Sequence, residues 1–190
     1  SRADNDCEWQ HCNCHRNLEY RMSTLELKEL SHPSGEVIKI AAGKTLDLKS
    51  QGTTTLPTGS VLQVVSETFG TEVAFTSGTY IDSGLSATIT PSSSSNKILI
   101  IANMHGYING TAQIGMNIVR DSTQIEEASR MLGYDDNTSA MMTLIELHGP
   151  TTTNAVTYKV QVKRTAGTAN CRINQQTGDG CKLILMEIAG

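Results

Sequence analysis

The sequence predicts an all-β protein: an antiparallel, jelly-roll-like β-sandwich preceded by a short segment that contains a β-hairpin. Short runs of Val, Ile, Leu and Thr recur along the C-terminal part of the chain, with Gly, Pro and Asn between them. Apolar and polar residues alternate clearly in one of these runs, so that Tyr158, Val160 and Val162 share a face. Aromatic residues make up only 4% of the chain. The core must therefore be aliphatic and thin, and burial between subunits is a reasonable way to complete it.

The strands of the predicted sandwich can be placed one by one. They are Val61–Ser66, Glu72–Phe75, Leu85–Thr90, Lys97–Met104, Gln113–Arg120, Met142–His148, Val156–Arg164, Ala169–Asn174 and Lys182–Ile188. The run Ile98–Ile101 is continuously apolar, which predicts a strand covered on both sides. Gln124–Leu132 has apolar residues at helical spacing, and both a helix and a strand followed by a loop fit it.

The chain divides into three predicted parts. Residues 1–21 form a polar leader that contains Cys and His, interpreted as disordered or non-native. Residues 22–58 form an attachment or shaft segment, in which Val37–Ile40 and Thr45–Leu48 flank a Gly-containing loop as a hairpin. A hairpin alone is marginal in water, so its apolar face must pack on other residues. We expect that face to line a trimer axis; its residues are Ile38, Ile40, Leu46 and Leu48. Residues 59–190 form the sandwich.

Charge and hydropathy exclude two classes of partner. The net charge is −4 and the basic residues are scattered, so nucleic acid is not an expected partner. No apolar run approaches the roughly 20 residues that a membrane-spanning helix needs, so membrane insertion is not expected either.

The five cysteines predict neither a metal site nor a disulfide framework. Cys7, Cys12 and Cys14 lie within one short loop and lack the paired C-x2-C spacing of a zinc site. Cys171 and Cys181 flank a predicted hairpin turn at Asp179-Gly180, which would place their sulfurs too far apart to bond. We expect two buried thiols, and no metal or cofactor.

The histidines and carboxylates do not form a catalytic pattern. His32, His105 and His148 lie in no nucleophile-elbow or zincin motif. The pairs Glu126-Glu127 and Asp135-Asp136 are adjacent in sequence, so their side chains diverge instead of facing each other across a substrate. The sequence therefore predicts no catalytic residue, and the protein is not expected to be an enzyme.

Three loops combine Tyr, Asn, Asp and Gly: Tyr107–Gly110, Gly133–Asn137 and Asn174–Gly180. Such residues suit adaptable hydrogen bonding to sugars or protein surfaces, and they are equally ordinary in exposed β-turns. The candidate contact residues in these loops are Tyr107, Asn109, Tyr134, Asp135, Asp136 and Asn137.

Four phrases of the sequence carry a family resemblance. They are Gly59–Val64, Ile89–Leu99, Thr157–Lys159 and Leu185–Gly190, and a fifth, Ile38–Leu48, is similar to the shaft-entry segments of fibres. Together they resemble the tail-fibre and fibre-like virion structural proteins of marine tailed bacteriophages, over roughly Met22 to Gly190. The resemblance implies a homotrimer assembled in the host cytoplasm and carried on the virion. It also implies contacts with other virion proteins and, through the candidate loops, with a host glycan or protein.

Three alternatives remain open from the sequence. The same sandwich could brace a capsid as a decoration or head-fibre protein, or act alone as a glycan-binding module. A polysaccharide-cleaving enzyme would need a carboxylate such as Asp135 or Glu126.

Overall fold

The computed structural model describes residues 42–43, 56–133, 137–175 and 180–190, and the chain divides into two units, Ser1–Thr53 and Thr54–Gly190. In the first unit Ala42 and Gly43 form a turn in which Gly43 has a φ of 73°, a value that favours glycine. The leader and the predicted trimer-axis residues lie outside the described residues: Ile38, Ile40, Leu46 and Leu48.

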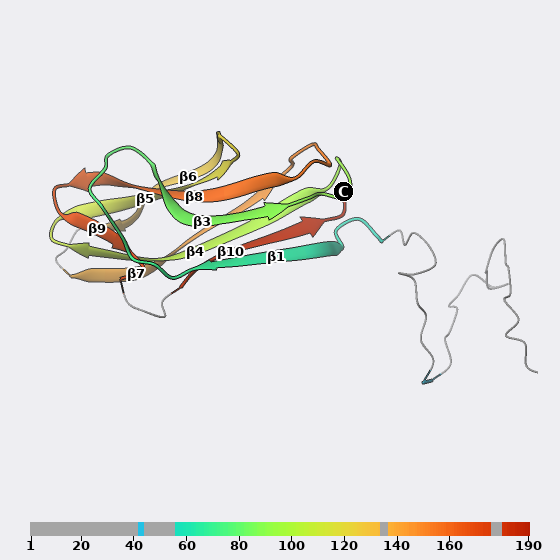
Figure 1. The fold of residues 1–190 in the computed structure, drawn as a ribbon, viewed down its shortest axis with the longest axis horizontal. Helices are drawn as coiled ribbons and strands as arrows, with labels where there is room; N and C mark the ends of the chain where they lie inside the picture. The colour runs from blue at the N-terminus through green and yellow to red at the C-terminus, as the bar shows by residue number, and fades with distance from the viewer. Residues whose placement is uncertain (1–41, 44–55, 134–136, 176–179) are drawn as a thin grey trace, which may run out of the picture. The chain divides into compact units, whose positions relative to one another are not determined.

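The second unit is an antiparallel β-sandwich, with strands and no helix among its described residues, so the predicted fold class is confirmed (Figure 1). Its strands are β1 (Val61–Phe69), β2 (Val73–Phe75), β3 (Ile81–Ile89), β4 (Lys97–Asn109), β5 (Ala112–Arg120), β6 (Thr123–Gly133), β7 (Thr138–His148), β8 (Val156–Gly167), β9 (Asn170–Ile173) and β10 (Cys181–Ile188).

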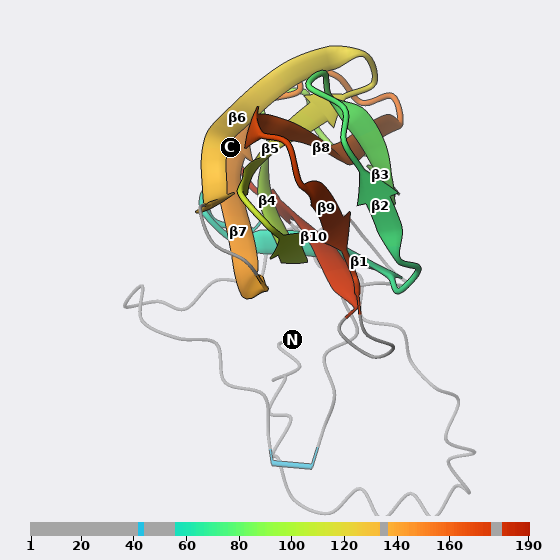
Figure 2. The ribbon, with the colours of Figure 1, turned by 90° about the vertical axis from the view of Figure 1, so that its left-hand side faces the viewer.

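The strands form two sheets. The first has the order β1-β10-β4-β9-β2 with β7 on β4 as well, and the second has the order β3-β8-β5-β6. Along β4, the partner changes from β10 to β9 on one edge, while β7 pairs along the whole of the other edge. β10 and β9 therefore lie nearly in line, as do β1 and β2 beside them. Figure 2 shows the two sheets end-on, with β6 bending from the second sheet toward β7 of the first.

The core lies between the sheets and is built by strict alternation. In β4 the inward residues are fully buried: Ile98, Ile100, Ala102, Met104 and Ile108. Tyr158, Val160 and Val162 of β8 are equally buried, as their shared face predicted. Burial of each Ile or Leu side chain removes apolar surface from water and stabilises the fold by about 2 kcal/mol. These aliphatic rows therefore hold the two sheets together.

The ambiguous stretch Gln124–Leu132 belongs to strand β6, so the helical alternative is wrong. β6 pairs with β5 through two irregularities, between Ile114 and Met116 and between Ile118 and Val119. At each irregularity β6 contributes more residues than β5. These extra residues break the two-residue period of β6, and the apolar spacing then imitates a helix.

Cys171 and Cys181 are both buried and are not bonded to each other, as predicted. The predicted hairpin at Asp179-Gly180 is wrong, because β9 and β10 do not pair with each other. Cys171 lies opposite Ile108 of β4, and Cys181 lies opposite Phe69 of β1. The two thiols therefore belong to different parts of the first sheet.

Asn174 occupies the break between β9 and β10. Its φ of 53° turns the chain out of line, and its buried side chain replaces the interrupted sheet hydrogen bonds. The Asn174 amide donates to the Phe69 carbonyl (2.8 Å), and its Oδ1 accepts from the Cys181 backbone N–H (3.1 Å). The Cys181 thiol also donates to Asn174 Oδ1 at 2.8 Å. One side chain thus joins β1, β9 and β10.

Candidate interaction surfaces

The sandwich has two ends, which we call proximal and distal. At the proximal end the segment before β1 pairs with the end of the chain, through Gly59 N–H to the Ala189 carbonyl and Ala189 N–H to the Ser60 carbonyl, both 2.9 Å. Gly190 N–H also donates to Asn96 Oδ1 at 3.0 Å. The chain therefore enters the sandwich and ends at the same place (Figure 1).

Glu187 is the centre of the proximal end. Its side chain points inward from β10 and has no exposed surface. It accepts hydrogen bonds from Gln63 Nε2 (2.5 Å), from the Ser92 N–H (2.6 Å) and hydroxyl (2.8 Å), and from Asn96 Nδ2 (2.6 Å). Burial raises the pKa of this carboxyl, but the hydrogen bonds from Asn96, Gln63 and Ser92 outweigh burial, so the pKa is lowered.

Sequence reasoning missed Glu187, although a signal for it exists. Cys181, Leu183 and Leu185 are inward residues of β10, and the two-residue period makes Glu187 the next one. A charged residue at an inward position is rarely buried unless it has partners, so its position predicts a network of donors around it.

The distal end carries the candidate contact residues that the structure describes. Tyr107 lies near the end of β4, and its hydroxyl donates a hydrogen bond to Asn137 Oδ1 at 2.7 Å. Asn109 ends β4 and lies opposite Asn170. Tyr134, Asp135 and Asp136 lie outside the described residues. The structure thus brings Tyr107 and Asn137 together, and the stretch of β4 from Lys97 to Tyr107 separates them from the proximal end by about 33 Å.

The two histidines that the structure describes make structural contacts, and His32 lies outside the described residues. His105 lies within β4, not beyond its end as expected, and its Nε2 is 2.6 Å from the Ser139 hydroxyl. His148 ends β7 as expected, and its Nδ1 is 2.9 Å from the Tyr158 hydroxyl. Burial lowers the pKa of His148 and raises that of Tyr158 to about 12. Among the described residues, no three His, Cys, Asp or Glu side chains gather where they could hold a metal ion.

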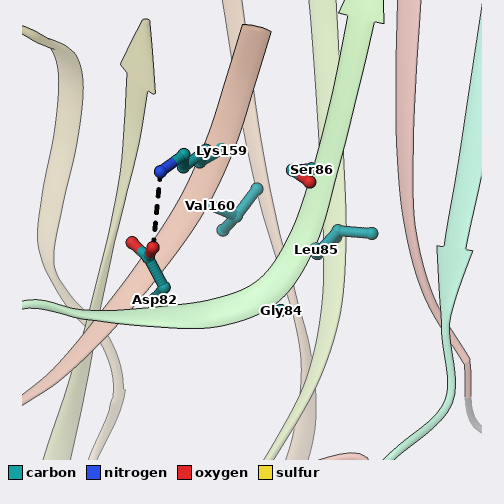
Figure 3. A pocket seen from close by; sticks show the side chains of 6 residues that line it. All are labelled: Asp82, Gly84, Leu85, Ser86, Lys159 and Val160. Atoms are coloured by element: carbon teal, nitrogen blue, oxygen red, sulfur yellow. Dashed lines mark hydrogen bonds and ion pairs between the residues drawn. The ribbon is translucent and has the colours of Figure 1, made fainter. Parts of the chain in front are cut away.

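A shallow hollow of about 210 Å³ lies on the second sheet, where β3 bulges (Figure 3). Gly84 allows this bulge, because its φ is +89° and a Cβ there would meet the Phe69 ring at 2.5 Å. An ion pair between Lys159 Nζ and Asp82 Oδ2, 3.5 Å long, crosses the rim. Both groups are well exposed, so the pair is worth little. Ser86 contributes a hydroxyl to the lining of this hollow. None of the hydrogen bonds of the described residues joins that hydroxyl to a side chain that could act as a general base.

The outer face of the second sheet is polar and its groups bond to one another. Gln161 Nε2 donates to Asp82 Oδ1 (2.6 Å), and the Thr88 and Thr157 hydroxyls are 2.9 Å apart. Lys163 Nζ lies 2.9 Å from Glu127 Oε1 and 4.2 Å from the centre of the Tyr80 ring. We call this surface the polar face.

The outer face of the first sheet carries an apolar patch beside polar positions such as Ser66, Asn103 and Thr143. The members of this patch come from four strands: Val64, Leu99, Ile101, Ile145, Leu147, Ile184 and Met186. We call this surface the apolar face. The predicted two-sided cover of Ile98–Ile101 is therefore only half present in the single chain: Ile98 and Ile100 are buried in the core, while Leu99 and Ile101 stay half-buried on the apolar face.

Comparison with known proteins gives fold likenesses alone. No protein-family model and no curated protein matches the chain. Among solved structures, the infectious bursal disease virus VP2 subviral particle matches with a TM-score of 0.43 and 12% identity, covering 77% of this chain and 42% of that one. The T=1 particles derived from that virus give 0.41 and 13%, with 77% and 41% covered. This chain spans about two fifths of those proteins.

A third solved structure is the virus-like particle of the extra small virus of the prawn Macrobrachium rosenbergii. It matches with a TM-score of 0.20 and 14% identity, covering 79% of this chain and 95% of that one. Similarity at this level is limited to the β-sandwich, so function has to be argued from the residues of this chain. The described part of the chain contains no helix long and apolar enough to cross a bilayer.

Proposed function

We propose that the chain is a structural subunit of a virus particle, of the fibre type. Its N-terminal segment attaches it to other virion proteins, and its sandwich displays the distal loops to a host glycan or protein. It carries out no chemical step and needs no cofactor. The observation that carries this proposal is the difference between the two ends of the sandwich: the four described phrases that resemble fibre proteins gather at the proximal end, and the described contact candidates lie at the other.

The gathering of these phrases follows from the topology. Gly59–Val64 opens β1, Ile89–Leu99 connects β3 to β4, and Leu185–Gly190 closes β10. Glu187 ties the three together through Gln63, Ser92 and Asn96. Thr157–Lys159 opens β8 close by, where Thr157 contacts Thr88 at the end of β3. The resemblance therefore concerns the end at which a fibre head would join its shaft.

The proposed mechanism is display in several copies. In a homotrimer, three distal ends face the host together, and linked weak sites gain avidity because each bound site raises the effective concentration of the next. Tyr107 and Asn137 suit this role, since an aromatic ring and an amide offer both stacking and hydrogen bonds to a sugar or a protein surface.

Labelling of intact particles tests the proposal. Antibodies against the sandwich, applied to virions of the virus that encodes the chain and viewed by electron microscopy, should mark the tail. Label on the head would replace the tail fibre with a decoration or head-fibre protein. Particles that bear no copy of the chain, combined with tight sugar binding by a monomer, would overturn the virion role in favour of a glycan-binding module.

A further inference from the structure

We propose that the apolar face of the first sheet is buried between copies of this chain. The inference rests on the proposed function, in which the subunit acts as an oligomer, and it identifies the surface through which the sandwich assembles.

The pairing registers arrange the apolar face in two adjoining rows. One row crosses four strands, with Val64 opposite Met186, Met186 opposite Leu99, and Leu99 opposite Leu147. The next row crosses three, with Ile184 opposite Ile101 and Ile101 opposite Ile145. Neighbours in a row are about 5 Å apart, so the seven side chains form one continuous surface.

This surface is open in the single chain. Val64 is 55% exposed, Ile145 60% and Leu147 49%. Three strand spacings along the rows and two residue steps between them give a backbone footprint of roughly 15 by 7 Å. The side chains extend this footprint on every side, and the largest apolar patch on a protein surface is often functional.

The polar face offers a comparison within the same chain, because it shows which residues occupy a sheet face that stays in solvent. The same chain fills the outer positions of β8 with Thr157, Lys159, Gln161 and Lys163, in alternation with core residues. The corresponding outer positions of β7 hold Met141, Thr143, Ile145 and Leu147. Solvent favours the first pattern, and cover by a further layer favours the second.

The chemistry of the apolar face favours a second copy as the occupant. The two rows contain no charged residue, and Lys97 and Lys182 flank them at the margins. An acidic or basic partner would lose its hydration there without gaining an ion pair. A second copy brings an identical apolar surface, and continuously apolar runs such as Ile98–Ile101 then receive the second cover that their sequence predicts.

A groove continues the apolar face on its distal side. It has a volume of about 270 Å³ and is lined by Ile101, Asn103, Met141, Gly180, Lys182 and Ile184. Asn103 Oδ1 is buried there and has no hydrogen-bond partner among the described residues. A buried acceptor without a donor costs about 1–3 kcal/mol, so a donor from the neighbouring copy would relieve it.

The test compares one charge on the two faces. The full chain, the variant Ile145→Glu and the control Ser86→Glu are examined by analytical ultracentrifugation under reducing conditions. Ser86 is exposed on the polar face opposite Lys159, so a glutamate there is well accommodated. We expect the wild type and Ser86→Glu to associate alike, and Ile145→Glu to associate at least about 100-fold more weakly, because a buried unpaired charge is costly.

Folding is checked separately from association. Ile145 is mostly exposed in the single chain, so Ile145→Glu should keep the wild-type β-sheet circular dichroism. Ile145→Ser, a milder change, should weaken association less. A wild type that stays monomeric at high concentration, or an Ile145→Glu variant that assembles like the control, would overturn the inference. Neither result bears on where the chain sits in a virion, which the labelling experiment decides.

Discussion

The two ends of the sandwich differ in how their polar groups are satisfied. At the proximal end Glu187 is completely buried and accepts four hydrogen bonds from Gln63, Ser92 and Asn96. At the distal end the hydrogen bond between Tyr107 and Asn137 is exposed. Removing a buried partner leaves the other groups unsatisfied, whereas water replaces an exposed one. The proximal end therefore specifies the fold, and the distal end is free to vary.

The largest effect is expected from Glu187→Ala. It strips the acceptor from the buried donors of Gln63, Ser92 and Asn96, which should cost about 3 kcal/mol of unfolding free energy. Urea unfolding followed by circular dichroism measures this, best in the Ile145→Glu background so that dissociation does not contribute. The matched control Glu72→Gln removes an exposed carboxylate near Arg172 and should change stability by less than about 0.5 kcal/mol. Equal losses in both variants would contradict the comparison.

Acid should weaken the proximal end selectively. Because the pKa of Glu187 is lowered in the folded chain, its ionised form stabilises the fold above the unfolded pKa of about 4.3. That stability is lost as the pH falls through the lowered folded pKa. Urea midpoints of the wild type should drop between pH 5 and pH 3, and those of Glu187→Gln should drop less. The pKa of Glu127 is also lowered, chiefly by its hydrogen bond with Lys163, and both proteins share that contribution. Parallel curves would contradict the assignment.

A smaller loss is expected where Asn174 joins β1, β9 and β10. Asn174→Ala removes the hydrogen bonds to the Phe69 carbonyl and the Cys181 N–H and keeps the unfavourable φ of 53°, so it should cost about 2 kcal/mol. Asn174→Gly removes the same bonds and relieves the φ, so it should be about 1 kcal/mol more stable than Asn174→Ala. Thermal melts of both variants make the measurement. Identical stabilities would mean that backbone strain plays no part.

The smallest effect on stability belongs to the distal end. Tyr107→Phe removes the exposed hydrogen bond to Asn137 and should shift unfolding by less than about 0.5 kcal/mol. Under the proposed function, the same change in virions should slow adsorption to host cells. Adsorption rates of virions that carry Tyr107→Phe or the control Ser86→Glu measure the second effect. A large loss of stability with normal adsorption would reverse the roles of the two ends.

The strand pattern was predictable because it depends on local signals. The alternation in Val156–Arg164 gave β8, and the turn residues between runs separated most other strands. Gln124–Leu132 stayed ambiguous since the irregular pairing of β6 with β5 breaks the two-residue period. The Asp179-Gly180 hairpin failed for a different reason: β9 and β10 both pair with β4, and no local signal states which distant strand a segment will choose.

The candidate site was less predictable than the fold. Tyr107 and Asn137 meet because β4 and β7 are neighbours, which the composition of their loops does not encode. The apolar face could be predicted only in part. The run Ile98–Ile101 predicted a strand covered on both sides, but a single sequence does not show what covers the outer side. The hydrogen-bond partners of Glu187 could not be predicted without the pairing register, because they come from segments far away in the sequence.

The pairing of β1 with β10 has a consequence for synthesis. The first strand of the sandwich is held by the last, from Val61 opposite Ile188 to Phe69 opposite Cys181. During translation more than a hundred residues are synthesised between β1 and its partner β10. Contacts this distant in sequence form late, because the intervening chain must first be closed into a loop. The proximal end is thus completed last, and a subunit truncated before β10 would leave β1 without its partner strand.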